Sequence, residues 1–436
     1  MRYLAITLTS LLTIFAVPLI AQGKEKSTKS AEIKLARMVT KADGNPAKLF
    51  AAAKFAKKNK LEDHAAELFG KVLAIQPDNK LVNEALGHKS ENGKWMAEVK
   101  GIWVEVSQKA EALNGAFFHE GKRVNTWEKK QLLKGQVRHK YTGMLIPAAD
   151  VEKANAGQFP LADGQWGDMA AANKYHSNIN NPWALRTRYC CLISSLPYET
   201  LSQKVWGVVD ETYTKLRMIC GGNPCHPDRI PVILVTPTTA SYIQFGDAYG
   251  GAGSSHGAFH TSAQQFTVSI TGNRRPVAAC NWDAKGWEPY YARHAAGLAI
   301  ANSYFGSESD SIPTWFTRGL AGYASRLFSN QMATYFGKQH ARHGTPEDLA
   351  KWMSGFSISG DNPQTGKGTN DYNIYQAGLL VKFCMHGGDQ ESTDALMAVT
   401  KAMSEGKGIS IAVRKLEKVL GTKSDAVAIY LEKITG

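Results

Sequence analysis

The sequence predicts an α+β fold for its larger, C-terminal part, and three observations carry this prediction. Residues 230–237 form a short continuous apolar run, which is typical of a strand that is buried on both faces. Two segments with helical spacing, residues 287–304 and 313–328, follow the expected strands. The rest of the chain to residue 436 is mostly helical in its periodicity. Strands followed by helices predict a mixed sheet and a mostly helical half.

The first 22 residues have the features of a secretory signal. Arg2 supplies a positive charge, residues 4–20 are apolar, and Leu19-Ile20-Ala21 offers a cleavage site with a small residue. We expect residues 1–22 to be the signal peptide and residues 23–30 a polar, lysine-rich tether, with a secreted or periplasmic mature protein. An uncleaved anchor is the alternative. No later segment reaches the roughly 18 apolar residues that span a bilayer, so no membrane span is expected after signal cleavage.

Residues 31–87 have a helical pattern that resembles a tetratricopeptide repeat. Apolar residues return every three or four positions, Pro46 occupies a position where a helix can begin, and Pro77-Asp78-Asn79 marks a turn. A stacked array needs about three repeats, and fewer than two fit here. We therefore expect a helical appendage that serves either for docking or for capping.

Residues 88–180 contain small modules that are each anchored by a tryptophan. Asn92-Gly93 comes just before Trp95, and Asp163-Gly164 comes just before Trp166. Both dipeptides are strong turn formers. We expect each module to bury one aromatic ring, and the alternative is an exposed ring that binds sugar or peptide.

The domain expected over residues 181–436 begins with a strand candidate at residues 184–196. Residues 197–220 have helical spacing, and residues 264–271 alternate like a half-exposed strand. One face of the helix expected within residues 197–220 carries four apolar residues, namely Val205, Val209, Tyr213 and Leu216.

The two helices expected at 287–304 and 313–328 resemble the catalytic helix pair of gluzincin-type zinc metallopeptidases, and more narrowly the peptidase MA-like proteins of bacterial envelopes. In that family the first helix carries H-E-x-x-H, and a later segment of the type P-x-W-x-x-E-G-x-A-x-Y supplies a third ligand, a glutamate. The resemblance covers residues 181–436. The residues in register with the second motif are Pro313, Trp315, Gly319, Ala321 and Tyr323.

The positions that carry the chemistry in that family are changed in this chain. His294 is retained, but Ala295 replaces the general base, Leu298 the second ligand and Arg318 the third. A catalytic zinc site uses three protein ligands that donate lone pairs, and arginine has none to give. The resemblance therefore implies an exported pseudoenzyme that binds or scaffolds, with no catalytic residue, no zinc and no other cofactor. The alternatives are a hydrolase with relocated metal or catalytic residues and a purely structural envelope protein.

His294 and Arg318 are nevertheless candidates for binding, because together they can hold a carboxylate. The alternative is that Arg318 pairs with a nearby acid such as Asp310 or Glu288. His256 and His260 are further binding candidates, in a glycine-rich loop that the resemblance puts near the cleft. A relocated metal site formed by these two residues and His294 is an alternative to mobile loop histidines.

Charge and cysteine content restrict the partners and the chemistry. The net charge is +13, from 51 basic and 38 acidic residues, without a run of five basic residues. This favours a protein, a peptide or an anionic envelope polymer as partner. Basic and aromatic residues do not interleave as in a nucleic-acid module, so no specific nucleic acid is expected. Export permits disulfides, and Cys220 and Cys225, which bracket Gly-Gly-Asn-Pro, are the candidate pair.

Overall fold

The structure is a computed structural model of the 436-residue chain. It describes residues 17–42, 44–99, 101–113, 115–119, 122–222, 228–249, 258–260, 277–283, 286, 288–326, 345–356 and 370–435. Helices and several small sheets are both present, in agreement with the predicted mixture of α and β structure.

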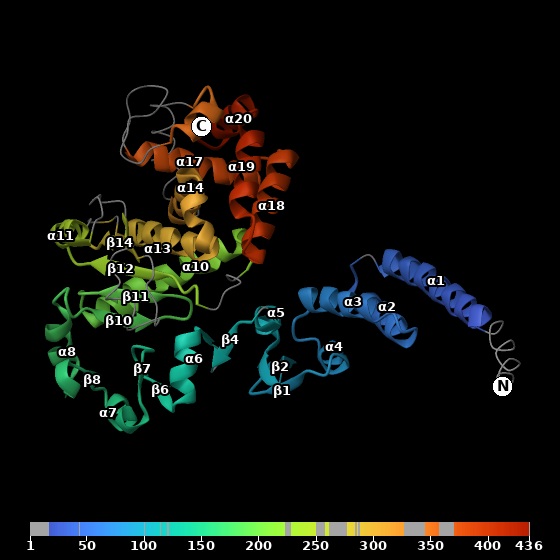
Figure 1. Cartoon of the computed structure of the whole chain (residues 1–436), viewed down its shortest axis with the longest axis horizontal. Helices are drawn as coiled ribbons and strands as arrows, with labels where there is room; N and C mark the ends of the chain where they lie inside the picture. Colours follow the sequence, from blue (N-terminus) through green and yellow to red (C-terminus); the bar gives the residue numbers. More distant parts are fainter. Residues whose placement is uncertain are drawn as a thin grey trace, which may run out of the picture. The chain divides into compact units, whose positions relative to one another are not determined.

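The chain divides into two compact units, Met1–Ala110 and Glu111–Gly436, whose elements are drawn in Figure 1. The segment expected to hold tryptophan modules, residues 88–180, is thus shared between them. Its larger part belongs to the second unit, together with the residues from 181 onward.

The first unit contains helices followed by a small sheet. Its elements are α1 (Val17–Ala42), α2 (Pro46–Lys58), α3 (Glu62–Ile75), α4 (Lys80–Ala85), β1 (Lys89–Glu91), β2 (Lys94–Val99) and β3 (Ile102–Glu105). The residues expected to form a tether, 23–30, are helical and belong to α1. A further helix, α5 (Lys109–Leu113), spans the division between the units.

Helix α2 begins and packs as its sequence predicts. The side chain of Asn45 accepts hydrogen bonds from the amides of Ala47 and Lys48, and Pro46 occupies the first turn, where its missing N–H is not needed. The buried face returns every three or four residues and consists of Leu49, Ala52, Ala53 and Ala56. These small side chains pack α2 against α1 and α3.

The predicted turns before the tryptophans are also present. Asn92 and Gly93 have φ values of 49° and 76°, and they connect β1 to β2 as a two-residue hairpin in which Glu91 pairs with Lys94. Such φ values suit asparagine and glycine, because both tolerate the left-handed conformation. Asp163 and Gly164 adopt the same conformation, with φ values of 53° and 75°.

The second unit begins with short hairpins and helices. They are β4 (Phe117–His119), β5 (Lys122–Val124), α6 (Thr126–Leu133), β6 (Gln136–Arg138), β7 (Leu145–Pro147), α7 (Val151–Asn155), β8 (Phe159–Pro160), β9 (Trp166–Gly167) and α8 (Met169–His176). A five-stranded sheet follows, built from β10 (Trp183–Arg186), β11 (Cys191–Ser194), β12 (Val232–Thr236), β13 (Ala258–His260) and β14 (Val277–Asn281).

A buried ion cluster joins the hairpin region to this sheet. The Glu128 carboxylate on α6 accepts from Arg186 Nε on β10 at 3.0 Å, and Arg138 Nη2 on β6 lies 3.3 Å from the same oxygen. Burial acts to raise the pKa of Glu128, but Arg186 and Arg138 outweigh it and hold the pKa below its ordinary value. Residues 111–180 are therefore fastened to the sheet by a charged contact across 58 residues of sequence.

The sheet has the order β10-β11-β12-β14-β13 and is mixed. β11, β12 and β14 run parallel, whereas β10 and β13 pair antiparallel at the two edges. Along β12, Ile233 and Val235 enter one core, and Val232 and Leu234 enter another on the opposite face. This two-sided burial accounts for the continuous apolar run in the sequence.

Helices cover both faces of the sheet. α10 (Trp206–Ile219) and α13 (Glu288–Phe305) share a core with one face, and α11 (Thr239–Tyr249) shares a core with the other. A short helix, α9 (Tyr198–Thr200), and a π-helical turn at Leu201–Val205 precede α10. The remaining helices are α14 (Thr314–Arg326), α16 (Leu349–Ser354), α17 (Asn370–His386), α18 (Gln390–Glu405), α19 (Ile409–Leu420) and α20 (Ser424–Thr435).

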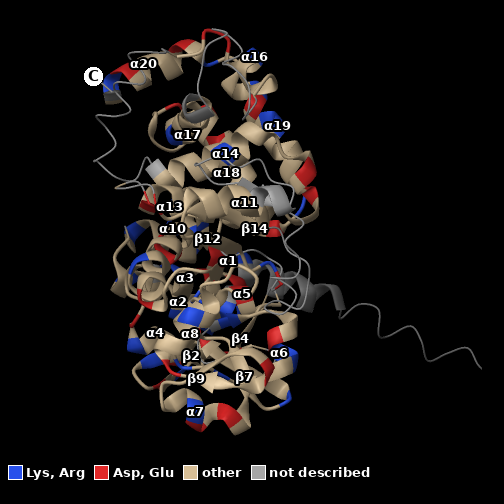
Figure 2. Ribbon diagram, turned by 90° about the vertical axis from the view of Figure 1, so that its left-hand side faces the viewer, with Lys and Arg blue, Asp and Glu red and all other residues tan. Residues whose placement is uncertain are grey.

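Charged residues of both signs are interspersed along the helices of the chain (Figure 2). In the part of the chain that the structure describes, no helix combines the length and apolar character that a membrane crossing requires.

Candidate functional site

The site predicted from the sequence lies where α13 crosses α14. A Cβ atom added to Gly297 on α13 would lie 2.8 Å from Ala321 Cα on α14, so the two helices are in backbone contact at this point. Glycine is required there because any larger side chain would separate the helices. This close crossing fixes the position of the residues one turn on either side.

Three of the residues that carry the resemblance to the metallopeptidases, Trp315, Gly319 and Tyr323, pack α14 against its neighbours. Trp315 is fully buried and donates from Nε1 to the Glu417 carboxylate of α19 at 2.7 Å. A Cβ at Gly319 would lie 2.8 Å from a carbonyl oxygen of α17, and the Tyr323 hydroxyl contacts His386 Nε2 of the same helix at 2.8 Å. These positions therefore fix α14 between α13 and its C-terminal neighbours.

His294 and Arg318 are brought together by this packing. Arg318 Nη1 lies 3.2 Å from His294 Nε2, and both residues are buried, with 8% and 2% of their surfaces exposed. Among the described residues, no carboxylate lies within salt-bridge distance of Arg318, and neither Asp310 nor Glu288 pairs with it. The pairing of Arg318 with a nearby acid, which the sequence leaves open, is thus not found.

The contact determines the state of the imidazole. A guanidinium has only donors, so Nε2 of His294 must accept the hydrogen bond through its lone pair. The ring is then neutral, with its proton on Nδ1. A metal ion bound at Nε2 would need the same lone pair, and the arginine is already directed at it.

Burial makes this arrangement electrostatically expensive. It lowers the pKa of Arg318 to about 10, although the interaction with Tyr242 on α11 acts in the opposite direction. Tyr242 is completely buried and is the residue that sequence reasoning missed at this site. No local pattern connects it with Arg318, because the two residues are 76 positions apart and meet only through the fold.

The other two positions that the resemblance singles out add no polar group. Ala295 and Leu298 are both buried, with 0% and 1% exposure, and belong to the hydrophobic core that α13 shares with the sheet. Alanine cannot take a proton from water, and leucine has no lone pair for a metal. Ala295 and Leu298 therefore supply neither a general base nor a metal ligand beside His294, and binding of a carboxylate by His294 and Arg318 stays a prediction.

The remaining candidates are only partly described. His256 and Cys225 lie outside the described residues, and His260 is seen only as the end of strand β13. The relocated histidine site and the Cys220–Cys225 disulfide therefore stay predictions; Cys220 is buried and has no disulfide partner among the described residues. Cys190 and Cys191 enter opposite cores. The expectation of one strand over residues 184–196 is wrong, because the chain turns at residues 187–190 and forms the antiparallel strands β10 and β11, so Cys190 lies just before a strand.

Within the described ranges, no cluster of three or more histidine, cysteine or acidic side chains has the geometry to hold a metal ion. Sequence comparisons match the chain to no family model and to no curated protein. The resemblance to the metallopeptidases therefore depends on the residues of the helix pair.

Proposed function

We propose that this protein is a non-catalytic relative of zinc metallopeptidases that works by binding or scaffolding. In this proposal residues 181–436 form a peptidase MA-like gluzincin domain and residues 31–87 a tetratricopeptide-like appendage. The observation that carries it is the 3.2 Å contact between Arg318 Nη1 and His294 Nε2. The one retained ligand of the zinc motif is occupied by a cation of the protein itself.

Charge supports the same conclusion. A guanidinium about 4 Å from a divalent ion is repelled by about 8 kcal/mol at an effective dielectric near 20. The replacement of the base by Ala295 and of the second ligand by Leu298 removes the groups that would offset this repulsion. An anion, by contrast, gains from the buried positive charge of Arg318.

We place the protein in the periplasm or at the cell surface, and its partner is a protein, a peptide or an anionic polymer of the envelope. The apolar, signal-like start of the chain and the net charge of +13 support this part of the proposal.

Metal analysis of the purified full chain tests the proposal directly. The wild-type protein, equilibrated with zinc and then dialysed, should retain far less than one equivalent. Stoichiometric zinc that disappears in His294→Ala would overturn the pseudoenzyme assignment. This measurement does not depend on a variant into which zinc binding has been introduced.

A restoration experiment tests whether α13 and α14 have the geometry of the metallopeptidase helix pair. The triple variant Ala295→Glu, Leu298→His, Arg318→Glu rebuilds the three missing positions of the motif. If the crossing of α13 and α14 has metallopeptidase geometry, the variant should bind one zinc and gain thermal stability on zinc addition. Adding His294→Ala to the triple variant is the matched control and should abolish binding. A folded triple variant without zinc affinity would refute the resemblance.

A further inference from the structure

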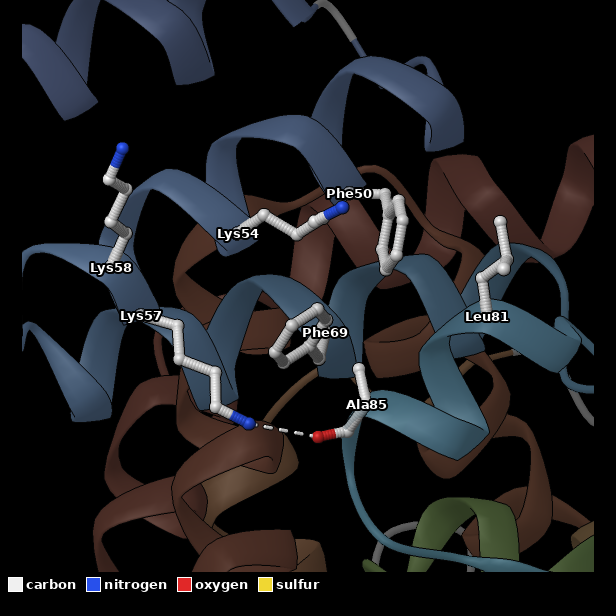
Figure 3. Close-up of a pocket in the computed structure, with 7 residues that line it drawn as sticks. All are labelled: Phe50, Lys54, Lys57, Lys58, Phe69, Leu81 and Ala85. Carbon is white, nitrogen blue, oxygen red and sulfur yellow. Dashed lines mark hydrogen bonds between the residues drawn. The ribbon is translucent and has the colours of Figure 1, made fainter.

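A pocket of about 360 Å³ in the first unit combines an apolar wall with a basic rim. Phe50 of α2, Phe69 of α3 and Leu81 of α4 form the apolar wall, and Leu81 has 60% of its surface exposed. Lys54, Lys57 and Lys58 form the rim (Figure 3). We call this site the lysine-rimmed pocket. Its volume falls in the range of about 300–1,000 Å³ that ligand sites occupy.

The positive charge of the rim is not neutralised by the neighbouring elements. Helix α2 contains four lysines and no acidic residue. Nearby carboxylates are paired elsewhere, since Glu67 binds Lys71 at 2.6 Å and Glu84 binds Lys80 at 3.8 Å. Among the described residues, no carboxylate lies within salt-bridge distance of the three rim lysines.

Two of the rim lysines are held in position. Lys57 Nζ donates to the carbonyl oxygen of Ala85 at 3.0 Å, at the end of α4, and Lys54 Nζ lies 5.6 Å from the centre of the Phe50 ring. Figure 3 shows Lys58 directed away from the aromatic rings. Its ammonium group is thus available to a ligand that extends beyond the wall. The charges of Lys54 and Lys57 are already held in position, which reduces the entropy lost when a ligand binds.

The shape of the wall favours a side chain over a nucleic-acid base. The rings of Phe50 and Phe69 are tilted by 50°, with centroids 5.9 Å apart, and Phe69 has only 2% of its surface exposed. Base stacking requires an open, flat aromatic face. A leucine or aromatic side chain, in contrast, can insert against a tilted apolar wall.

We infer that the lysine-rimmed pocket binds an acidic peptide segment, which inserts one leucine or aromatic side chain against Leu81 and presents carboxylates to Lys54 and Lys58. This gives the binding role proposed above a class of partner. It rests only on residues of the first unit, so failure of peptide binding leaves the zinc measurements on His294 and Arg318 unaffected, and the two proposals fail separately.

The test measures binding of the full chain to a fluorescein-labelled peptide in which glutamates flank a central Leu-Phe pair, by fluorescence anisotropy. Saturable binding that weakens with added salt is expected, because exposed charges are screened beyond about 8 Å at physiological ionic strength. Lys54→Glu and Lys58→Glu should each weaken binding by about five- to tenfold, since each replaces an attraction by a repulsion.

Lys48→Glu is the matched control. Lys48 is exposed on the same helix, and at about 100° per residue it lies about 120° around the axis from Lys54. It should change the affinity less than about twofold. Leu81→Ser, an exposed substitution that leaves every charge in place, should lower the affinity for the peptide by several fold. Replacement of the peptide's Leu-Phe pair by alanines should have the same effect.

Four results would overturn the inference. The first is the absence of saturable binding. The second is an equal loss of affinity in Lys48→Glu and Lys54→Glu, and the third is an unchanged affinity for the alanine peptide, because either would show a general attraction for negative charge. The fourth is tighter binding of a single-stranded oligonucleotide of equal charge than of the peptide, with a loss of its affinity in the same variants.

Discussion

Replacement of Arg318 by methionine should stabilise the second unit. Burial lowers the pKa of Arg318 from its ordinary value near 12.5 to about 10. A tenfold change in proton affinity corresponds to about 1.4 kcal/mol, so the charged form costs the folded state about 3 kcal/mol. The lowered pKa means that the folded protein binds this proton less tightly than the unfolded chain. At neutral pH Arg318 is charged in both the folded and the unfolded state, so the folded state is destabilised by the whole of this free energy. The destabilisation is relieved only as the pH rises above about 10.

Methionine has a similar length and no charge to bury, but it forfeits the contact with His294. A hydrogen bond to a charged group contributes about 1.5–3 kcal/mol, and the cost above, which comes from burial and Tyr242, does not include it. We therefore expect a net gain of about 0–1.5 kcal/mol for Arg318→Met. Replacing a buried charge by an apolar residue of similar volume is often neutral or stabilising.

Urea unfolding followed by tryptophan fluorescence at neutral pH measures this gain. Trp183, Trp315 and Trp352 are buried in the second unit and report on it. The midpoint should move to higher urea at an unchanged slope. Arg293→Met, on the neighbouring helix α13, is the control. It breaks the 3.1 Å pair with Glu211 and should cost about 0–1 kcal/mol. A loss of more than about 1 kcal/mol in Arg318→Met would refute the reasoning, because the guanidinium would then be fully compensated.

Two further predictions concern the crossing of α13 and α14 and the buried ion cluster around Glu128. Gly297→Ala should destabilise the second unit by about 1–3 kcal/mol, because the added Cβ would lie 2.8 Å from Ala321 Cα. The control is Gly207→Ala, in open space on α10, which should stabilise the second unit by up to about 1 kcal/mol. Equal effects of the two substitutions in urea unfolding would contradict the close crossing of α13 and α14. Glu128→Gln should cost about 3–5 kcal/mol at neutral pH. Because the pKa of Glu128 is lowered, the wild type should lose this stability as the pH falls below about 4.5, and a pH series of unfolding midpoints should show a smaller acid loss in the variant.

The elements that the sequence predicts well are those whose local pattern reflects their burial. β12 reads as an apolar run because cores cover both of its faces. The buried face of α10, with Val209, Tyr213 and Leu216, repeats with helical spacing because one side enters the core that α10 shares with the sheet. Turns such as Asn92-Gly93 are predicted by the conformational freedom of the two residues alone.

Long-range electrostatics could not be predicted in the same way. Glu128 and Arg186 are 58 positions apart, and only the Asn125 capping box, an asparagine three residues before the glutamate, marks this carboxylate in the sequence. Charge complementarity suggests an acidic partner for Arg318, but the crossing of α13 and α14 presents the His294 ring instead. The partner of a buried charge depends on which helices meet, and this information is absent from any local window of sequence.

The contact between His294 and Arg318 is informative because it opposes stability. A core position at the crossing of two helices would be occupied at lower cost by an apolar residue, as Leu298 is. A buried cation without a described carboxylate instead contacts Nε2 of His294. Residues that reduce stability at such a place are expected where a function requires them. The two variants of Arg318 therefore ask complementary questions. Arg318→Met measures what the cation costs, and Arg318→Glu, together with Ala295→Glu and Leu298→His, asks whether a zinc site forms once the cation is removed, as the proposed function predicts.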